Sequence, residues 1–446
     1  VSEISDFFSP TQHRDHLVGI HIETIITEVS KQELPLKFDL VMISTGINQI
    51  ADEGSFMLLY PFQDDEIWIS LQEGDETMRI AMIGQKGMHS RAGGIEVHVE
   101  EIGSRLAAMG HDLLIYARSD YCSALLENYK GMRIIHINNL NTKHFDTITY
   151  TAASTLHALK SGAEIIHFHA LGPSLFAFLP RLFGRKVICT VHGLDWKREK
   201  WGRVTKLFLK LGEHIGVRYA HRAISVSETL LPYFKEKYHK VPVYIPNGVY
   251  VKPKPSADIL FKSFGLDENS YILFLSRIVP EKGLHFLIEA YKGLKTDKKL
   301  VIAGGSSHSD PYLRSVMRQA EGVTNIVFTG FVEGEVLEAL FSHAYLYVLP
   351  STIEGLPISL LEAMSYGTLC LTSDIDENRT VLRDYGFTFR NRDVEDLRSR
   401  LAQLLASRDG YDSQKTIEYI RERFTWDYVA IQTAFVYESV CSKNNK

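Results

Sequence analysis

Residues 345–372 read YLYVLPSTIEGLPISLLEAMSYGTLCLT, and this stretch decides the fold class of the chain. The apolar run 345–349 predicts a buried strand, and a second apolar run, 369–372, predicts another. Between them we expect a helix over 357–366, since proline is favoured at the first helical position and Gly367 suits the left-handed residue that ends a helix. A strand, loop, helix and strand in this order are typical of an α/β fold with a parallel sheet.

Two carboxylates, Glu354 and Glu362, flank the start of this helix, with seven residues between them. The loop that follows a parallel strand, at a helix N-terminus, is a natural site for an anion. Backbone N–H groups at Gly355 and Leu356 could hold a phosphate there, while the carboxylates grip other parts of the same ligand. The alternative stays open on spacing alone: a solvated loop glutamate and an ordinary helix glutamate.

The size and composition of the chain exclude several classes of protein. Its 446 residues are too many for one ordinary core and predict at least two domains. Its net charge of −5 gives no bulk attraction to nucleic acid. No apolar run approaches the roughly 20 residues needed to cross a bilayer, and no signal-peptide pattern is visible. The scattered cysteines and the histidines show no metal-binding spacing, so we expect a cytoplasmic protein with reduced thiols and no metal.

The first 77 residues differ from the rest, because acidic turns break them into short apolar segments. We predict a small α+β extension over 1–77, of unknown role. It is either an accessory module or in part a segment that precedes a native start at Met78. The expected elements are a strand or helix over 21–30 and strands over 38–44, 56–60 and 66–71.

Strands and helices alternate regularly over residues 78–250, which predicts a doubly wound parallel sheet. A helix is expected over 95–109, directly after Gly93 and Gly94, where the missing side chains allow a ligand to approach the backbone. This loop lacks GxGxxG spacing, so a nicotinamide-binding fold is the less favoured alternative. The strands are expected over 78–83, 113–116, 132–137, 165–168, 187–191 and 223–226.

Polar residues end two of these strands. His169 ends one strand, and His192 and Asp195 follow the next. Ligands of open parallel sheets bind outside the carboxyl ends of strands, so we expect these side chains to face a ligand, with a purely structural role as the alternative. His167 is expected to point to the other face of the sheet.

A second alternating set follows a linker predicted over 242–248 and 252–255. Its first strand, 271–276, leads into a loop that carries Arg277 and Lys282, and two fixed cations of this kind can neutralise a diphosphate. Asp374-Ile375-Asp376 resembles a metal-binding DxD motif but is interpreted as helix capping. Further strands are expected over 300–303 and 326–328, before the stretch quoted above.

These residues together resemble the glycosyltransferases of the GT-B fold, family 4, a large retaining group, over Met78 to about Ser442. The sequence departs from the family at Tyr250, where aspartate is frequent, and at Asp376-Glu377, where small residues or proline are frequent. The motifs that carry the resemblance are Gly93-Gly94-Ile95-Glu96, His169, Thr190-Val191-His192-Gly193, Ser225-Val226-Ser227, Ile245-Pro246-Asn247-Gly248, Ser276-Arg277, Lys282-Gly283, Ala303-Gly304-Gly305 and the Glu354 and Glu362 pair.

The resemblance implies two Rossmann-like domains: an acceptor domain over 78–250, joined by a returning helix over 426–446, and a nucleotide-sugar donor domain over 251–425. It implies that Arg277 and Lys282 hold the donor diphosphate, while Glu354 contacts the sugar and Glu362 the ribose. The implied site residues are catalytic Glu354, His169, Arg277 and Lys282; donor-binding Gly94, Arg277, Lys282, Gly304, Gly355, Leu356 and Glu362; and acceptor-binding Gly93, His169, His192 and Asp195.

The implied function is retaining, metal-independent transfer of a sugar from a nucleotide donor, which is a substrate rather than a cofactor. The acceptor would be a glycan or a polyprenyl-linked glycan of cell-surface polysaccharide synthesis. Two alternatives stay open: a nucleotide-sugar epimerase on a GT-B-like fold, and a non-catalytic donor-binding subunit.

A basic amphipathic segment suggests contact with the inner face of the plasma membrane. Trp201, Val204, Phe208, Leu211 and Ile215 fall on one helical stripe, with Leu207 beside it. Such a helix either lies in an anionic lipid interface or packs on its own sheet with a solvated basic face. The neighbouring bases are Arg181, Arg185, Lys186, Lys197, Arg198, Lys200, Arg203, Lys206 and Lys210.

Overall fold

The computed structural model describes residues 49–52, 55–62, 65–72, 77–88, 93–119, 121–122, 125–138, 146–197, 201–305 and 310–442. The chain divides into two units, with the boundary after Leu71. The strands expected over 56–60 and 66–71 are confirmed, whereas the segments 21–30 and 38–44 lie outside the described residues. The first unit holds a three-stranded sheet of β1 (Gln49–Asp52), β2 (Ser55–Phe62) and β3 (Asp65–Gln72), in which β1 and β2 are antiparallel.

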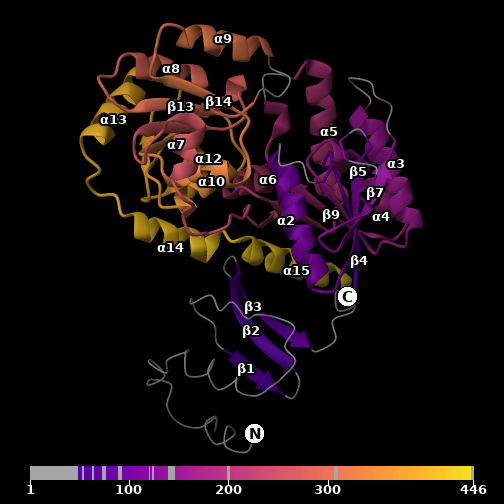
Figure 1. The fold of residues 1–446 in the computed structure, drawn as a ribbon. Helices are drawn as coiled ribbons and strands as arrows, with labels where there is room; N and C mark the ends of the chain where they lie inside the picture. The colour runs from indigo at the N-terminus through magenta and orange to yellow at the C-terminus, as the bar shows by residue number, and fades with distance from the viewer. Residues whose placement is uncertain are drawn as a thin grey trace, which may run out of the picture. The chain divides into compact units, whose positions relative to one another are not determined.

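The second unit contains two sheets, and the first has eight strands in the order β11-β10-β9-β8-β4-β5-β7-β6 (Figure 1). The pairing is parallel except between β6 and β7. Helices cover both faces, so the central strands are buried and read as continuous apolar runs. The strands are β4 (Arg79–Ile83), β5 (Asp112–Arg118), β6 (Asn128–Tyr129), β7 (Met132–Ile137), β8 (Ile165–His169), β9 (Lys186–Val191), β10 (Arg222–Ser225) and β11 (Val243–Tyr244).

Amphipathic helices connect these strands. In α2, the apolar side chains of Val99, Ile102 and Leu106 are fully buried, and Ile95 is partly buried against the same core. The helix starts at Gly94, one residue before the predicted start. The elements are α2 (Gly94–Ala108), α3 (Asp146–Lys160), α4 (Phe178–Leu182), α5 (Arg203–Tyr219) and α6 (Leu231–Tyr238), with short 3₁₀ turns η2 (Pro173–Phe176), η3 (Asp195–Lys197) and η4 (Glu228–Leu230).

The second sheet is parallel throughout, with its six strands in the order β14-β13-β12-β15-β16-β17. Chain order therefore runs outward from β12 in one direction and then from β15 in the other, as in a doubly wound fold. The strands are β12 (Tyr271–Leu275), β13 (Lys299–Ala303), β14 (Ile326–Gly330), β15 (Leu346–Leu349), β16 (Cys370–Ser373) and β17 (Phe387–Phe389).

The quoted stretch forms the predicted strand, loop, helix and strand, with one correction. Pro357 is the N-cap residue and the helix starts at Ile358, because the ψ angle of Pro357, 105°, is extended. Gly367 closes the helix with a φ of +67°, as predicted. The helices of this half are α7 (Asp258–Phe264), α8 (Leu284–Lys292), α9 (Asp310–Ala320), α10 (Gly334–Ser342), α11 (Ile358–Ser365), α12 (Asp376–Leu382), α13 (Val394–Ala406) and α14 (Ser413–Arg423), with the turn η5 (Pro280–Lys282).

The last helix, α15 (Trp426–Cys441), returns to the first sheet and lies beside α2 (Figure 1). Trp426, Val429 and Tyr437 are buried in the same core as Ile80 and Val99. The predicted linker 242–248 is partly wrong, because β11 within it pairs with β10 and completes the sheet. Among the described residues, none of the helices has both the length and the apolar content needed to cross a membrane.

Candidate functional site

The predicted site residues follow the strands on either side of the point where each sheet reverses its order. In the first sheet this point lies between β4 and β8, and in the second between β12 and β15. His169 ends β8, Arg277 follows β12, and Glu354 follows β15. Loops at such a point splay apart and leave room for a ligand at the carboxyl edge. The topology thus places these three residues where an open parallel sheet binds its ligand.

The loops of the two sheets meet at His192 and Gly355. A Cβ atom on Gly355 would lie 1.9 Å from the carbonyl oxygen of His192, so only glycine allows this approach. The side-chain amide of Asn247 donates to the carbonyl oxygen of Leu356 at 3.2 Å. Gly94 faces α11, since a Cβ on it would lie 3.5 Å from Cδ1 of Ile358. The loops that carry the predicted donor and acceptor residues therefore lie against one another.

An ion pair joins two residues that were predicted separately. The Lys282 ammonium lies 2.5 Å from a carboxylate oxygen of Glu354, and the side chains are only 12% and 8% exposed. Arg277, half-buried in the same edge, has no hydrogen-bond acceptor among the described residues. Gly304 lies against the same loop, because a Cβ there would be 2.0 Å from the carbonyl oxygen of Ser276. One cation is thus neutralised within the protein and the other is available to an anion.

The second carboxylate, Glu362, lies in the second turn of α11, as predicted, and is half-buried. The charges of Glu362 and Glu354 both act on the buried side chain of Tyr347. Burial raises the pKa of Tyr347 well above its ordinary value, and both carboxylates add to that rise. The Tyr347 hydroxyl donates a hydrogen bond to the hydroxyl of Ser359 at 2.9 Å. This bond ties the first turn of α11 to β15. The carboxylate pair accordingly spans the N-terminal half of the helix.

Four histidines line the edge of the first sheet. They are His98 from α2, His167 and His169 from β8, and His192 after β9. The rings of His167 and His169 lie 4.1 Å apart, so the expectation that His167 points to the opposite face is wrong. Residues two apart on a strand share a face, because side chains alternate with a period of two.

His192 is the only one of these rings that is partly exposed in the described structure, and His169 is completely buried behind it. Burial lowers the pKa of His98 to about 4, with the hydrogen bond to Asn247 acting in the opposite direction. Burial and repulsion among the rings hold the pKa values of His167, His169 and His192 well below the ordinary value. The cluster is therefore uncharged at neutral pH.

A buried carboxylate holds the loop that carries His192 and Asp195. Glu213 of α5 is completely buried and accepts a hydrogen bond from the indole N–H of Trp196 at 2.7 Å. It also accepts from Tyr233 and Tyr238, at 2.7 and 2.6 Å, and from the Lys237 ammonium at 2.7 Å. Four donors satisfy this charge, which burial alone would make costly. The Asp195 turn is consequently anchored to α5 and α6.

The residues of the DxD-like motif do not act as predicted. Asp374 accepts a hydrogen bond from the backbone N–H of Asn391 at 2.8 Å rather than capping α12. The N-cap residue is Ile375, without a side-chain cap. Glu377 is a carboxyl that the sequence reasoning left without a role. Burial raises its pKa, Lys197 opposes the rise, and Asp376 and Glu354 add to it, so Glu377 borders the Glu354 loop.

Sequence reasoning also missed His98 and Asn247. Nδ1 of His98 lies 3.0 Å from the side-chain oxygen of Asn247, a contact between residues 149 apart in sequence. One signal for His98 was available in the sequence. This polar residue lies one turn after Gly94, where α2 begins, and that position faces the edge of the sheet.

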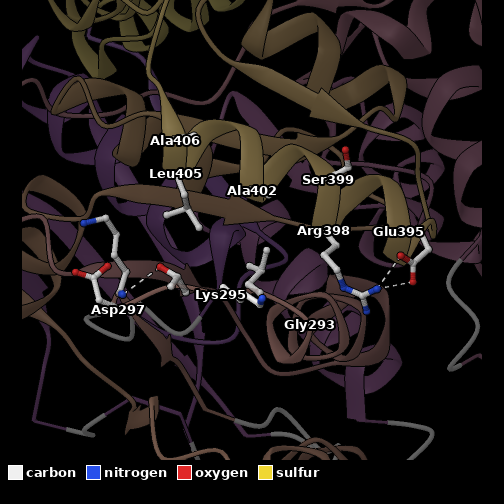
Figure 2. A pocket seen from close by; sticks show the side chains of 12 residues that line it. Gly293, Lys295, Asp297, Glu395, Arg398, Ser399, Ala402, Leu405 and Ala406 are labelled. Atoms are coloured by element: carbon white, nitrogen blue, oxygen red, sulfur yellow. Dashed lines mark hydrogen bonds and ion pairs between the residues drawn. The ribbon is translucent and has the colours of Figure 1, made fainter.

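A shallow open depression of about 800 Å³ lies elsewhere, between α13 and the loop from α8 to β13 (Figure 2). This loop precedes β13, so it lies at the amino edge of the sheet, away from the carboxyl edge. Arg398 on its wall is bound to Glu395 at 2.6 Å and to the carbonyl oxygen of Ala290 at 3.2 Å. Its polar groups are engaged in holding helices together, and the candidate site is therefore placed at the carboxyl edges of the two sheets.

Two family descriptions match the chain in succession: Glycosyltransferase Family 4 over residues 92–252 and Glycosyl transferases group 1 over residues 256–423. A phosphatidyl-myo-inositol mannosyltransferase of Mycobacterium leprae is 28% identical over 385 residues, covering 83% of this chain and 99% of that protein. Sucrose-phosphate synthase of Thermosynechococcus elongatus has a similar structure, with a TM-score of 0.71 and 21% identity, over 81% of this chain and 99% of its own. An Anabaena protein solved in complex with UDP and glucose also has a similar structure, with a TM-score of 0.69 and 18% identity. The match covers 81% of this chain and 100% of that protein.

Proposed function

Because this chain is a glycosyltransferase with the GT-B fold, we propose that it moves a sugar from a nucleoside-diphosphate donor to a glycan or lipid-linked acceptor, with retention at the anomeric carbon. The observation that carries the proposal is the contact between Gly355, which follows the Lys282–Glu354 pair in the loop after β15, and the loop of His192. Cations on one side and neutral rings on the other suit a ligand with a charged end and a hydroxyl-rich end.

The donor diphosphate binds to Arg277, Lys282 and the backbone N–H groups at the start of α11, beside Gly355 and Leu356. Arg277 supplies a planar fork and Lys282 a point charge, so the two serve different phosphate oxygens. Gly304 lets the donor approach the backbone, and Glu362 receives the ribose hydroxyls. The Anabaena neighbour that binds UDP and glucose supports a nucleoside diphosphate as the ligand class.

The sugar lies between Glu354 and His192, and its bond to the leaving diphosphate breaks there. The acceptor hydroxyl attacks from the same side, so the new C–O bond forms as the old one breaks, and the hydroxyl proton passes to a phosphate oxygen. Negative charge grows on the diphosphate, and Arg277, Lys282 and the helix N-terminus stabilise it. The side-chain cations make a metal unnecessary, and a retaining front-face attack needs no enzyme nucleophile.

The acceptor lies on the side of the first sheet, near Gly93, His192 and Asp195. Partly exposed His192 is positioned to contact the sugar or the acceptor, and buried His169 positions His192 from behind. The mannosyltransferase of Mycobacterium leprae acts, by its name, on a phosphatidylinositol, which favours a lipid-linked acceptor over a free sugar.

A membrane contact through α5 fits such an acceptor. Val204, Leu207 and Leu211 are 83%, 69% and 48% exposed on the outer side of this helix, with Arg203, Lys206 and Lys210 around them. Trp201 and Ile215, by contrast, pack against the protein interior, so the predicted stripe divides into two. Arg198 and Lys200 lie outside the described residues. An apolar ridge among bases suits an anionic lipid surface.

The test is a screen of nucleotide sugars by thermal shift, followed by transfer assays with lipid-linked acceptors and assignment of the product anomer by NMR. We expect one donor to raise the melting temperature, a product with the donor configuration, and full activity after EDTA treatment. An inverted product contradicts the retaining mechanism, and activity that only Mg²⁺ or Mn²⁺ restores contradicts metal independence. Conversion of the donor without an acceptor identifies an epimerase, and binding without turnover a donor-binding subunit.

A further inference from the structure

Three imidazoles from three separate elements converge at the edge of the first sheet. His98 comes from α2, His169 from the end of β8 and His192 from the loop after β9. One ring nitrogen of each lies within 4.8 Å of a ring nitrogen of the other two. His98 and His169 are buried and His192 is partly exposed, so solvent reaches this group of three through His192.

We infer that His98, His169 and His192 form a binding site for a divalent transition-metal ion such as Zn²⁺, and that the bound ion inhibits glycosyl transfer. Nε2 of His192 and Nδ1 of His169 are 3.4 Å apart. This is long for a hydrogen bond, but it is about the separation of two ligands on a tetrahedral ion with metal–nitrogen bonds of roughly 2.0–2.1 Å.

The surroundings of His98 set its tautomer. The side-chain amide of Asn247 donates to Leu356, so its oxygen is free to accept from Nδ1 of His98 at 3.0 Å. Nδ1 therefore carries the proton, and the lone pair is on Nε2. A hydrogen bond from the outer nitrogen of a ligating histidine to an oxygen is the usual support of a metal site.

The tautomer of His169 is not fixed by a hydrogen bond at its Nε2 atom, unlike the tautomer of His98. Its Nε2 is buried and has no hydrogen-bond partner among the described residues, so its surroundings do not commit the ring to one tautomer. His167 is excluded as a ligand, because Tyr437 and Thr190 occupy its two nitrogens at 2.7 Å each. Three protein ligands leave a fourth position for a ligand that exchanges, as in catalytic zinc sites.

The donor set selects the class of ion. Imidazole nitrogens suit Zn²⁺, Cu²⁺ and Ni²⁺, whereas Mg²⁺ and Ca²⁺ need oxygen ligands.

The inhibition rests on the proposed function, whereas the binding does not. His192 borders the contact with Gly355, where the proposed sugar lies. An ion bound to the His192 ring places positive charge where the proposed sugar lies. It also engages the imidazole nitrogen, which then cannot contact the substrate. This site is unrelated to the metal-free stabilisation of the diphosphate by Arg277 and Lys282.

The experiment titrates the full chain, stripped with EDTA, with Zn²⁺ by calorimetry and with Co²⁺ by visible spectroscopy, without donor or acceptor. We expect one tight site, with the intense d–d bands of tetrahedral Co²⁺. His98→Gln, whose amide can still donate to Asn247, should lose that site. The matched control His136→Gln, at a half-buried histidine of β7 bonded to the carbonyl oxygen of Leu126, should keep it.

Transfer by the wild type should fall at Zn²⁺ concentrations that fill the site and recover with EDTA, whereas whatever transfer His98→Gln retains should not respond to Zn²⁺. An unchanged Zn²⁺ titration in His98→Gln, or octahedral Co²⁺ bands only, overturns the site. Should His98→Gln not fold, His192→Gln replaces it in the binding titration. Tight binding without loss of transfer overturns the inhibition alone. Because binding is measured without substrates, failure of the proposed function would not affect that result.

Discussion

The carboxyl edges of the two sheets have the same topological position and opposite chemistry. The edge of the first sheet presents neutral imidazoles, whose charge burial suppresses. The edge of the second presents Arg277 and the Lys282–Glu354 pair. One fold thus presents uncharged rings at the edge of one sheet and cations at the edge of the other. The difference arises from the few residues that follow each strand, since the strands themselves are alike.

The presence or absence of a charged partner explains why the two groups differ. The Lys282–Glu354 pair, with side chains only 12% and 8% exposed, keeps its charges because each partner stabilises the other. The imidazoles have no carboxylate partner among the described residues, so desolvation leaves them uncharged. A charged ligand therefore gains more from the second edge than from the first.

The largest effect is expected at Glu354, where the two edges meet. Glu354→Gln should reduce transfer by about 100-fold or more, which corresponds to about 2.7 kcal/mol of barrier, because a carboxylate toward the sugar is lost. Nucleoside-diphosphate affinity should change little. Steady-state transfer and calorimetry measure the two effects. Transfer within about threefold of wild type would show that Glu354 is not in contact with the reacting sugar.

Removing Arg277 and removing Lys282 should have different effects on the stability of the protein. Arg277→Ala and Lys282→Ala should both weaken diphosphate binding by about 1.5–3 kcal/mol, or roughly 10–150-fold. Only Lys282→Ala should also lower the melting temperature, because it leaves the buried Glu354 carboxylate unpaired. The double variant Lys282→Ala with Glu354→Gln should recover that stability. Unchanged diphosphate affinity in both single variants rules out the diphosphate site.

The acceptor half should bind anionic vesicles through α5. Arg203→Glu with Lys206→Glu should weaken co-sedimentation by about tenfold or more, at roughly 1 kcal/mol per base, and added salt should weaken the wild type. The control is Arg421→Glu with Arg423→Glu, an exposed basic pair on α14. Equal loss in both double variants, or none in either, excludes α5 as the lipid contact.

Because its buried histidines are neutral, the folded protein should lose free energy of unfolding as the pH falls. The pKa of folded His98 is about 4, below its ordinary 6.5, so the unfolded chain binds more protons between these values. Stability should be complete above about pH 6.5 and fall as the pH drops toward 4. His98→Gln should flatten this slope by a few degrees of melting temperature, the smallest effect expected here. Thermal melts from pH 4 to 8 measure it, and identical slopes in both proteins contradict it.

Local patterns predicted most of the elements, whereas the contacts that join the site residues were not predicted because they are long-range. Apolar runs located the central strands, because strands buried on both faces need continuous apolar residues. The pairing of Lys282 with Glu354 spans 72 residues, and that of His98 with Asn247 spans 149, so no periodicity reveals either. The two-residue strand β11 was taken for linker, since its length carries no pattern. The face of His167 was assigned wrongly although strand alternation was sufficient to assign it.

The sequence by itself determined the alternating α/β fold, the glycine that closes α11, and the residues that follow each strand. These depend on neighbours in the chain, whose backbone preferences and burial are local properties. Only the tertiary structure decided which of those residues meet: that His192 lies against Gly355, that Glu354 neutralises Lys282, and that three imidazoles converge without charge. Contact and desolvation depend on distances across the fold, which no local pattern encodes.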